Sequence, residues 1–229
     1  MSNKERIRKA FKLTIPVLTG YICLGIGFGI ILEAKGYGVL WAFCMGLFIY
    51  AGSMQYVAVD LISGGASLIA TALTTLMVNA RHLFYGISMI EKYKGTGMKK
   101  PYLMMSLTDE TYSLVVSEHS SDKKLYFLIS LFNHCYWVIG CTVGSLIGSV
   151  LDFNTNGVEF VLTALFVTVF VEQWLNCKNH LPAVIGVVST VLCLVVFGAE
   201  YFLIPSMILI TIVLAVLKKY TVSEVNSDE

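Results

Sequence analysis

The chain alternates between long apolar runs and short polar breaks. Most runs come close to the roughly 17–25 residues that cross a bilayer as a helix. Eight such segments can be marked, at residues 13–32, 39–61, 68–90, 101–116, 125–150, 158–175, 181–197 and 201–217. The pattern predicts an all-α fold, a polytopic transmembrane helical bundle that forms one domain over residues 13–217. Residues 1–12 form a basic N-terminal segment and residues 218–229 a polar tail.

Composition supports a membrane protein and excludes two other classes. Hydrophobic residues make up 56% of the 229 positions, charged residues only 14%, and the mean hydropathy is +0.75. An average soluble domain carries roughly 25% charged residues, so a soluble fold of this size would leave too much apolar surface uncovered. The net charge of +1, with no basic stripe outside the short loops, also argues against a nucleic-acid partner.

Basic residues in the short loops predict the orientation and raise one conflict. Lysines and arginines at positions 4, 6, 8, 9 and 12 place the N-terminus in the cytoplasm by the positive-inside rule. Eight full crossings would then export the loop at residues 91–100, which carries lysines at 92, 94, 99 and 100. If segments 68–90 and 101–116 were re-entrant or broken and turned back, this loop would be cytoplasmic. Eight crossings and six crossings with two re-entrant segments therefore both remain open.

Charged residues interrupt two of the apolar segments. Arg81 and His82 lie in segment 68–90, and Asp109 and Glu110 lie in segment 101–116. A charge in the hydrocarbon core costs at least about 2.5–3.5 kcal/mol on insertion scales, so such residues face a cavity, pair with one another or mark a pathway. These positions predict a transporter.

The charged side chains suit the two ends of an amino-acid zwitterion. A guanidinium can form two parallel hydrogen bonds to a carboxylate, so Arg81 is a candidate to bind a substrate carboxylate. Asp109 and Glu110 are candidates for a proton-coupling site or an ammonium site, because a carboxylate partly removed from water exchanges protons closer to neutral pH. The alternatives are that Arg81 pairs permanently with an acid or reaches a lipid headgroup, and that the acids face water from an interfacial helix.

Further polar residues extend the candidate site. In segment 39–61, a glycine and a serine leave backbone groups available to a ligand, and a glutamine can both donate and accept hydrogen bonds. In segment 68–90, the i, i+3, i+4 rule places asparagine and histidine on one helix face and a tyrosine beside Arg81. The predicted substrate-binding residues are Gly52, Ser53, Gln55, Asn79, Arg81, His82 and Tyr85. We predict no catalytic residue, cofactor or metal ion.

Glycine spacing predicts where helices approach closely. Gly25 and Gly29 are four residues apart in the first segment, and Gly140, Gly144 and Gly148 repeat the spacing in the fifth. Small residues at this spacing let helix backbones touch within a membrane. We interpret both sets as packing surfaces.

These residues, in this order, resemble the AzlC family. The resemblance rests on YAGSMQY at residues 50–56, on NARHLFY at 79–85 and on LTDE at 107–110, and extends to Trp137 and the glycines of the fifth segment. It spans nearly the whole chain. Met54 stands where the family usually has alanine, which changes the wall of a pocket formed there.

The resemblance implies a function that the residues alone do not give. Members of this family are large subunits of two-component permeases or exporters that move branched-chain amino acids, mainly outward and coupled to protons. It therefore implies an amino-acid substrate, a small hydrophobic AzlD-like subunit as partner, and a multi-pass location in a bacterial inner membrane.

Two other classes of function remain open. An intramembrane enzyme would use His82, His134, Asp109 and Glu110 as metal ligands or as acid and base, although no HExxH-like pair shares a helix face. A channel or assembly subunit would show flux without proton coupling, or none. Transport of each hydrophobic amino acid, and a metal assay, would separate these classes.

Overall fold

The computed structural model describes residues 2–118, 122–151, scattered positions between 160 and 175, and 179–225. The described residues contain helices and no strand. They divide into two compact units, Met1–Leu162 and Thr163–Glu229, which are treated separately below. Segment 158–175 lies mostly outside the described residues.

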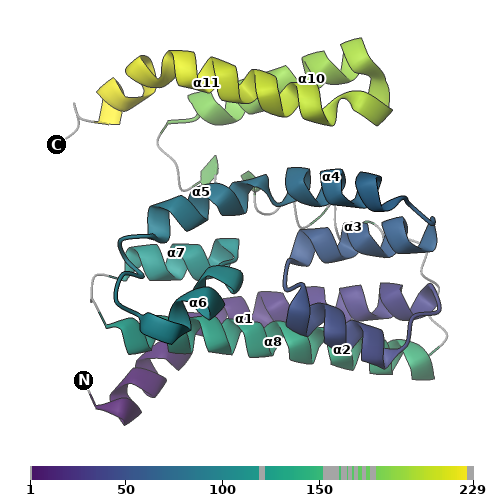
Figure 1. Ribbon diagram of the computed structural model, residues 1–229, viewed down its shortest axis with the longest axis vertical. Helices are drawn as coiled ribbons and strands as arrows, with labels where there is room; N and C mark the ends of the chain where they lie inside the picture. The colour runs from purple at the N-terminus through teal and green to yellow at the C-terminus, as the bar shows by residue number, and fades with distance from the viewer. Residues whose placement is uncertain are drawn as a thin grey trace. The chain divides into compact units, whose positions relative to one another are not determined.

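Two long helices, α1 (Asn3–Ala34) and α8 (Lys123–Val150), form the frame of the first unit and run side by side in the same direction (Figure 1). Arg6 Nε lies 2.6 Å from Asp122 Oδ2 at one end, and Ser145 Oγ lies 2.5 Å from Glu33 Oε2 at the other. We call the end with Arg6 and Asp122 the basic end, and the end with Glu33 and Ser145 the opposite end. At 32 and 28 residues the helices measure about 48 and 42 Å, enough to cross a bilayer.

The predicted glycine packing joins α1 to α8. A Cβ built on Gly25 would lie 2.9 Å from the backbone nitrogen of Cys141, and one on Gly144 would overlap the backbone of Ile26. Any side chain at these positions would push the helices apart. The packing role of the glycines is therefore confirmed.

The helices α2 (Val39–Phe48) and α3 (Gly52–Ser63) form a hairpin that begins and ends at the opposite end. Lys35 Nζ lies 3.8 Å from Asp60 Oδ1 at that end. Between the helices the chain turns at Tyr50, which has φ +44°, a strained value for a residue with a side chain. The turn lies halfway along α8, since Leu47 O is 3.2 Å from His134 Nε2. Each helix is about 15–18 Å long, half the thickness of a membrane.

The helices α4 (Leu68–Val78) and α5 (Ala80–Met89) run together from the opposite end to the basic end. They are separated by a single residue, Asn79, with φ −95° and ψ 6°. Together they measure about 33 Å, enough for one crossing. Past α5, Tyr93 packs in the buried cluster that holds Ala10 and Leu125, which lies at the basic end.

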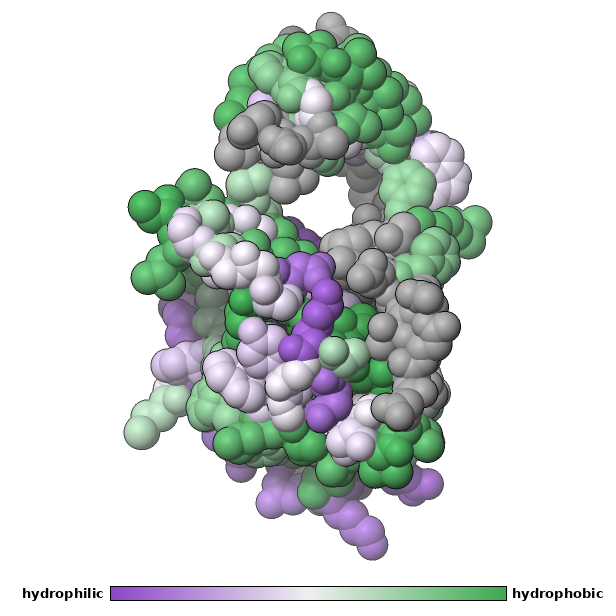
Figure 2. Space-filling view, turned by 90° about the vertical axis from the view of Figure 1, so that its right-hand side faces the viewer, coloured by the Kyte–Doolittle hydropathy of each residue, from purple (hydrophilic) through white to green (hydrophobic). Residues whose placement is uncertain are grey.

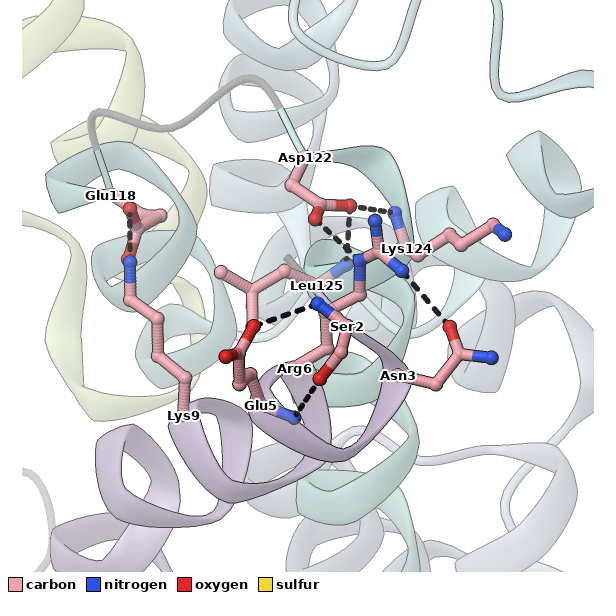
Figure 3. Close-up of polar contacts among 9 residues, drawn as sticks. All are labelled: Ser2, Asn3, Glu5, Arg6, Lys9, Glu118, Asp122, Lys124 and Leu125. Atoms are coloured by element: carbon pink, nitrogen blue, oxygen red, sulfur yellow. Dashed lines mark hydrogen bonds and ion pairs between the residues drawn. The ribbon is translucent and has the colours of Figure 1, made fainter.

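The helices α6 (Lys100–Met105) and α7 (Asp109–Ser117) form a second hairpin, which begins and ends at the basic end. A short 3-10 helix, η1 (Gly97–Lys99), leads into α6. Beyond the end of α7, Lys9 Nζ contacts Glu118, at 2.8 Å from Oε2 (Figure 3). Arg6 at this end donates to Asp122 and lowers the pKa of that carboxyl.

This arrangement corrects the sequence-based topology. The lysine-rich loop at residues 91–100 does lie at the same end as the N-terminus. The segments that turn back, however, are 39–61 and 101–116, whereas 68–90 continues from end to end. The strained turn at Tyr50 reverses the chain, while one non-helical residue at Asn79 only interrupts it. The prediction of eight crossings is not confirmed.

The surface of the first unit matches a membrane setting. Figure 2 looks onto the opposite end and shows hydrophilic residues at the centre of this end of the first unit and hydrophobic residues on its flanks. Large apolar side chains such as Leu68 and Phe84 are well exposed. By length and apolar composition, three described helices can cross a membrane: α1, α8 and the stretch Leu181–Gly198.

The second unit contains α10 (Leu181–Tyr201) and α11 (Leu203–Val225), which pack against each other. Gly198 bends α10 with φ +75° and ψ 171°, a conformation available to glycine.

Candidate functional site

Three helices begin close together in the middle of the first unit. These are α3, α5 and α7, which begin after the breaks before Gly52, Ala80 and Asp109. Their N-termini lie near one another, as the contacts of the Arg81 side chain with Ser53 of α3 and Asp109 of α7 show. A helix N-terminus carries a partial positive charge and free N–H groups. Broken helices aimed in this way are where transporters commonly bind anionic groups of a substrate.

Arg81 links the three helix starts. Its Nη1 lies 2.6 Å from Asp109 Oδ2, and its Nη2 donates a hydrogen bond of 3.0 Å to Ser53 Oγ. The two charged side chains are 33% and 25% exposed. Arg81 is thus paired with Asp109, as one of the sequence-based alternatives expected, and the pair is reachable rather than sealed.

The ion pair leaves hydrogen-bonding capacity unused. Within the described residues, the buried Arg81 Nε has no acceptor and the buried Asp109 Oδ1 has no donor. Asn79 Oδ1, at the start of the same helix as Arg81, is also buried without a partner there. Unpaired buried polar atoms are rare in proteins, so their clustering here is consistent with a site that a polar ligand completes.

Glu110 has different surroundings from its neighbour Asp109. Its Oε2 accepts a hydrogen bond of 2.7 Å from the Tyr21 hydroxyl, which also lies 2.6 Å from Thr108 Oγ1. Thr108 and Asn133 both contact the Thr111 hydroxyl, at 3.1 and 3.0 Å. No cation pairs with Glu110 among the described residues. The two adjacent acids therefore face separate groups, one a guanidinium and the other a network of hydroxyls.

Gln55 is fully buried beside α8. Its Oε1 accepts hydrogen bonds from Trp137 Nε1 at 2.7 Å and from the backbone nitrogen of Ala51 at 3.2 Å. Its Nε2 has no partner among the described residues. A Cβ on Gly52 would lie 3.3 Å from the Trp137 ring, so a side chain at Gly52 would crowd this contact. Trp137 therefore holds the start of α3 in place.

The other predicted residues lie on or beside α5. His82 Nδ1 is 3.2 Å from the carbonyl oxygen of Asn79, so this nitrogen carries a proton and donates to it. The Tyr85 ring stacks on Tyr112 of α7, with centroids 4.5 Å apart. His82 thus orients the start of its own helix, and Tyr85 aligns α5 with α7.

Two residues of the site were not predicted from the sequence. Tyr21 reaches Glu110 from α1, and Tyr50 lies under the ring of His134 with its hydroxyl unpartnered among the described residues. His134 also contacts Tyr102, with Nδ1 3.0 Å from the hydroxyl, so it connects both hairpins to α8. A tyrosine in an apolar run carries no local signal that separates such a role from packing.

Comparisons with known proteins identify the family to which the chain is similar. A sequence model of the family described as AzlC protein matches residues 16–151. The chain is 44% identical over 216 residues to the Branched-chain amino acid transport protein AzlC of Bacillus subtilis, which covers 93% of this chain and 85% of that protein. It is 44% identical over 219 residues to an uncharacterized membrane protein of Helicobacter pylori, covering 94% and 96% of the two chains.

A more distant relative is the Inner membrane protein YgaZ of Escherichia coli, 28% identical over 213 residues, with 88% of this chain and 84% of that protein covered. No solved structure matches the chain.

Proposed function

Because the chain belongs to the AzlC family, we propose that it carries amino acids with branched, hydrophobic side chains across a bacterial inner membrane. The similarity to a relative named as a branched-chain amino acid transport protein supports this substrate class. The helices that can cross a membrane support the location. The lysine-rich loop and the N-terminus at one end support a cytoplasmic position for that end.

The observation that carries the proposal is the Arg81–Asp109 pair with its unused atoms. An amino-acid zwitterion brings one carboxylate and one ammonium, which are the partners that Arg81 and Asp109 each prefer. The substrate carboxylate would take the place of Asp109 on Arg81, and the ammonium would take the place of Arg81 on Asp109. Each protein charge exchanges one partner for another, so neither is left unpaired in a low-dielectric site.

The surrounding groups fit the same substrate. The N-terminal ends of α3 and α5 favour a carboxylate, and Ser53 is already in hydrogen-bonding contact with Arg81. The substrate's aliphatic side chain would lie against apolar faces of the half-helices. Opening the Arg81–Asp109 pair would also release one of the contacts between α5 and α7 and leave the Tyr85–Tyr112 stack, which would link substrate binding to movement of the second hairpin.

We assign proton coupling to Glu110 rather than to Asp109. Asp109 has a guanidinium beside it, whereas Glu110 has hydroxyl partners and no cation among the described residues. An ionised carboxylate at membrane depth without a cation is costly, so binding a proton there is favourable. Export driven by the proton gradient, together with a small AzlD-like hydrophobic subunit, completes the proposal.

Accumulation of amino acids in cells tests the function. Cells that lack this chain and its proposed partner are fed dipeptides of leucine, isoleucine, valine or alanine, with or without both genes restored. We expect the two genes to lower the internal concentration of branched-chain amino acids and to leave alanine less affected. Equal accumulation with and without the genes would contradict transport, and flux that ignores the pH gradient would indicate a channel.

A further inference from the structure

A groove lies against the first turns of α1, at the basic end. It has a volume of about 530 Å³ and is lined by Lys4, Ile7, Arg8, Phe11 and Phe132. The first four residues recur at i, i+3, i+4 and i+7, so they share one face of the helix. Phe11 and Phe132 meet edge to face across the base of the groove, with ring centroids 6.4 Å apart.

Four of the five cations of this helix segment fall into two groups, and the fifth, Lys12, does not line the groove. Arg6 and Lys9, which do not line the groove, are neutralised by Asp122 at 2.6 Å and by Glu118 at 2.8 Å (Figure 3). Lys4 and Arg8 make no ion pair or side-chain hydrogen bond within the described residues. The groove therefore carries two positive charges that the described chain leaves without an acid.

The groove also combines charged and apolar side chains, which alternate along the helix. Its apolar side chains Ile7 and Phe11 are 50% and 47% exposed. Lys4 and Arg8 come before the apolar part of a helix long enough to cross the membrane. Cations at this depth lie beside lipid phosphates, and the apolar side chains that follow lie beside acyl chains.

We propose that this groove binds an anionic phospholipid. Lys4 and Arg8 hold the headgroup phosphate, while Ile7, Phe11 and Phe132 contact an acyl chain. Free inorganic phosphate would pair with the two cations but would not cover the apolar side chains. A phospholipid would do both, so the two ligands differ in the apolar surface that they bury. The site is independent of the Arg81–Asp109 pair.

Lipid binding to the purified full chain in a neutral detergent tests the proposal. Native mass spectrometry measures the dissociation constant of phosphatidylglycerol and of phosphatidylcholine for the wild type and for two matched double variants. Lys4→Gln with Arg8→Gln removes the groove charges, and Lys94→Gln with Lys100→Gln removes two exposed cations of the loop that lies at the same end. Near an anionic lipid each basic residue strengthens binding about fivefold, so the groove variant should bind phosphatidylglycerol roughly 30-fold more weakly.

We expect the loop variant to bind phosphatidylglycerol within about threefold of the wild type, and millimolar phosphate not to displace the lipid. Phe11→Ala should weaken the binding of both lipids, because it removes part of the apolar wall of the groove. Both double variants should melt at the wild-type temperature without added lipid, since the substituted lysines and arginine are exposed. Phe11→Ala should melt slightly lower, because it also loses the edge-to-face contact with Phe132. Equal affinity of the wild type for the two lipids, equal losses in both double variants, or displacement by phosphate would overturn the proposal.

Discussion

Replacing Arg81 by lysine separates the geometry of the guanidinium from its charge. Arg81 offers three nitrogens, of which Nη1 and Nη2 contact Asp109 and Ser53 and Nε has no partner among the described residues. A bound carboxylate can therefore take two parallel hydrogen bonds. Lysine keeps the charge and offers a single nitrogen, so one charge-assisted hydrogen bond is lost. Such a bond contributes about 1.5–3 kcal/mol, which corresponds to a dissociation constant for leucine about 10- to 160-fold larger.

The assay is equilibrium binding of labelled leucine to detergent-solubilised protein, measured with and without the proposed small subunit. Arg8→Lys is the matched control, since it makes the same exchange at a cation outside the candidate site. Arg81→Ala should weaken leucine binding further, to the level of a ligand that lacks the carboxylate. Leucine binding by Arg81→Lys within about twofold of the wild type, at normal levels of folded protein, would refute the bidentate role, and the same result for Arg81→Ala would leave only a structural ion pair.

Three further predictions follow from the surroundings of the site. Glu110→Gln should abolish transport driven by a pH gradient while leucine still binds, and gradient-driven transport at the wild-type rate would contradict proton coupling there. In a cysteine-free background, an impermeant reagent should label Lys94→Cys only from the cytoplasm and Ala66→Cys only from outside, because the two residues lie at different ends of the first unit. Labelling of both cysteines from the same side would exclude this topology. Asp122→Asn should lower the free energy of unfolding at pH 7 by about 1 kcal/mol, because it weakens the contact with Arg6. The lowered pKa of Asp122 means that this difference persists down to about pH 4 and disappears at lower pH, which acid unfolding curves of both proteins measure.

Apolar periodicity predicted the helices but not how they turn. Whether the segments containing Arg81 and Asp109 cross fully or are broken was left open by the sequence, and both are broken beside those residues. The reversal in segment 39–61 was missed, because a left-handed residue at Tyr50 leaves no mark in hydropathy. The positive-inside rule identified residues 91–100 as in conflict with eight full crossings, and the structure has this loop at the same end as the N-terminus.

The candidate site was predictable where charge stood out against an apolar background. Ser53, Arg81 and Asp109 were chosen from the sequence and lie in contact. The difference between Asp109 and Glu110 was not predictable, because it arises from Tyr21, which is 89 residues away along the chain. Contacts of this kind depend on which helices become neighbours, and no local pattern encodes them.

The central claim is that an amino-acid zwitterion exchanges with the Arg81–Asp109 pair. Isothermal titration with leucine, leucinamide and 4-methylpentanoate tests it most directly, because the amide lacks the carboxylate and the acid lacks the ammonium. The account predicts that leucine binds at least about tenfold more tightly than either analogue, that Asp109→Asn removes the preference for leucine over 4-methylpentanoate, and that Arg81→Ala removes the preference over leucinamide. Equal binding of the three ligands to the wild type, or preferences that both variants retain, would contradict it.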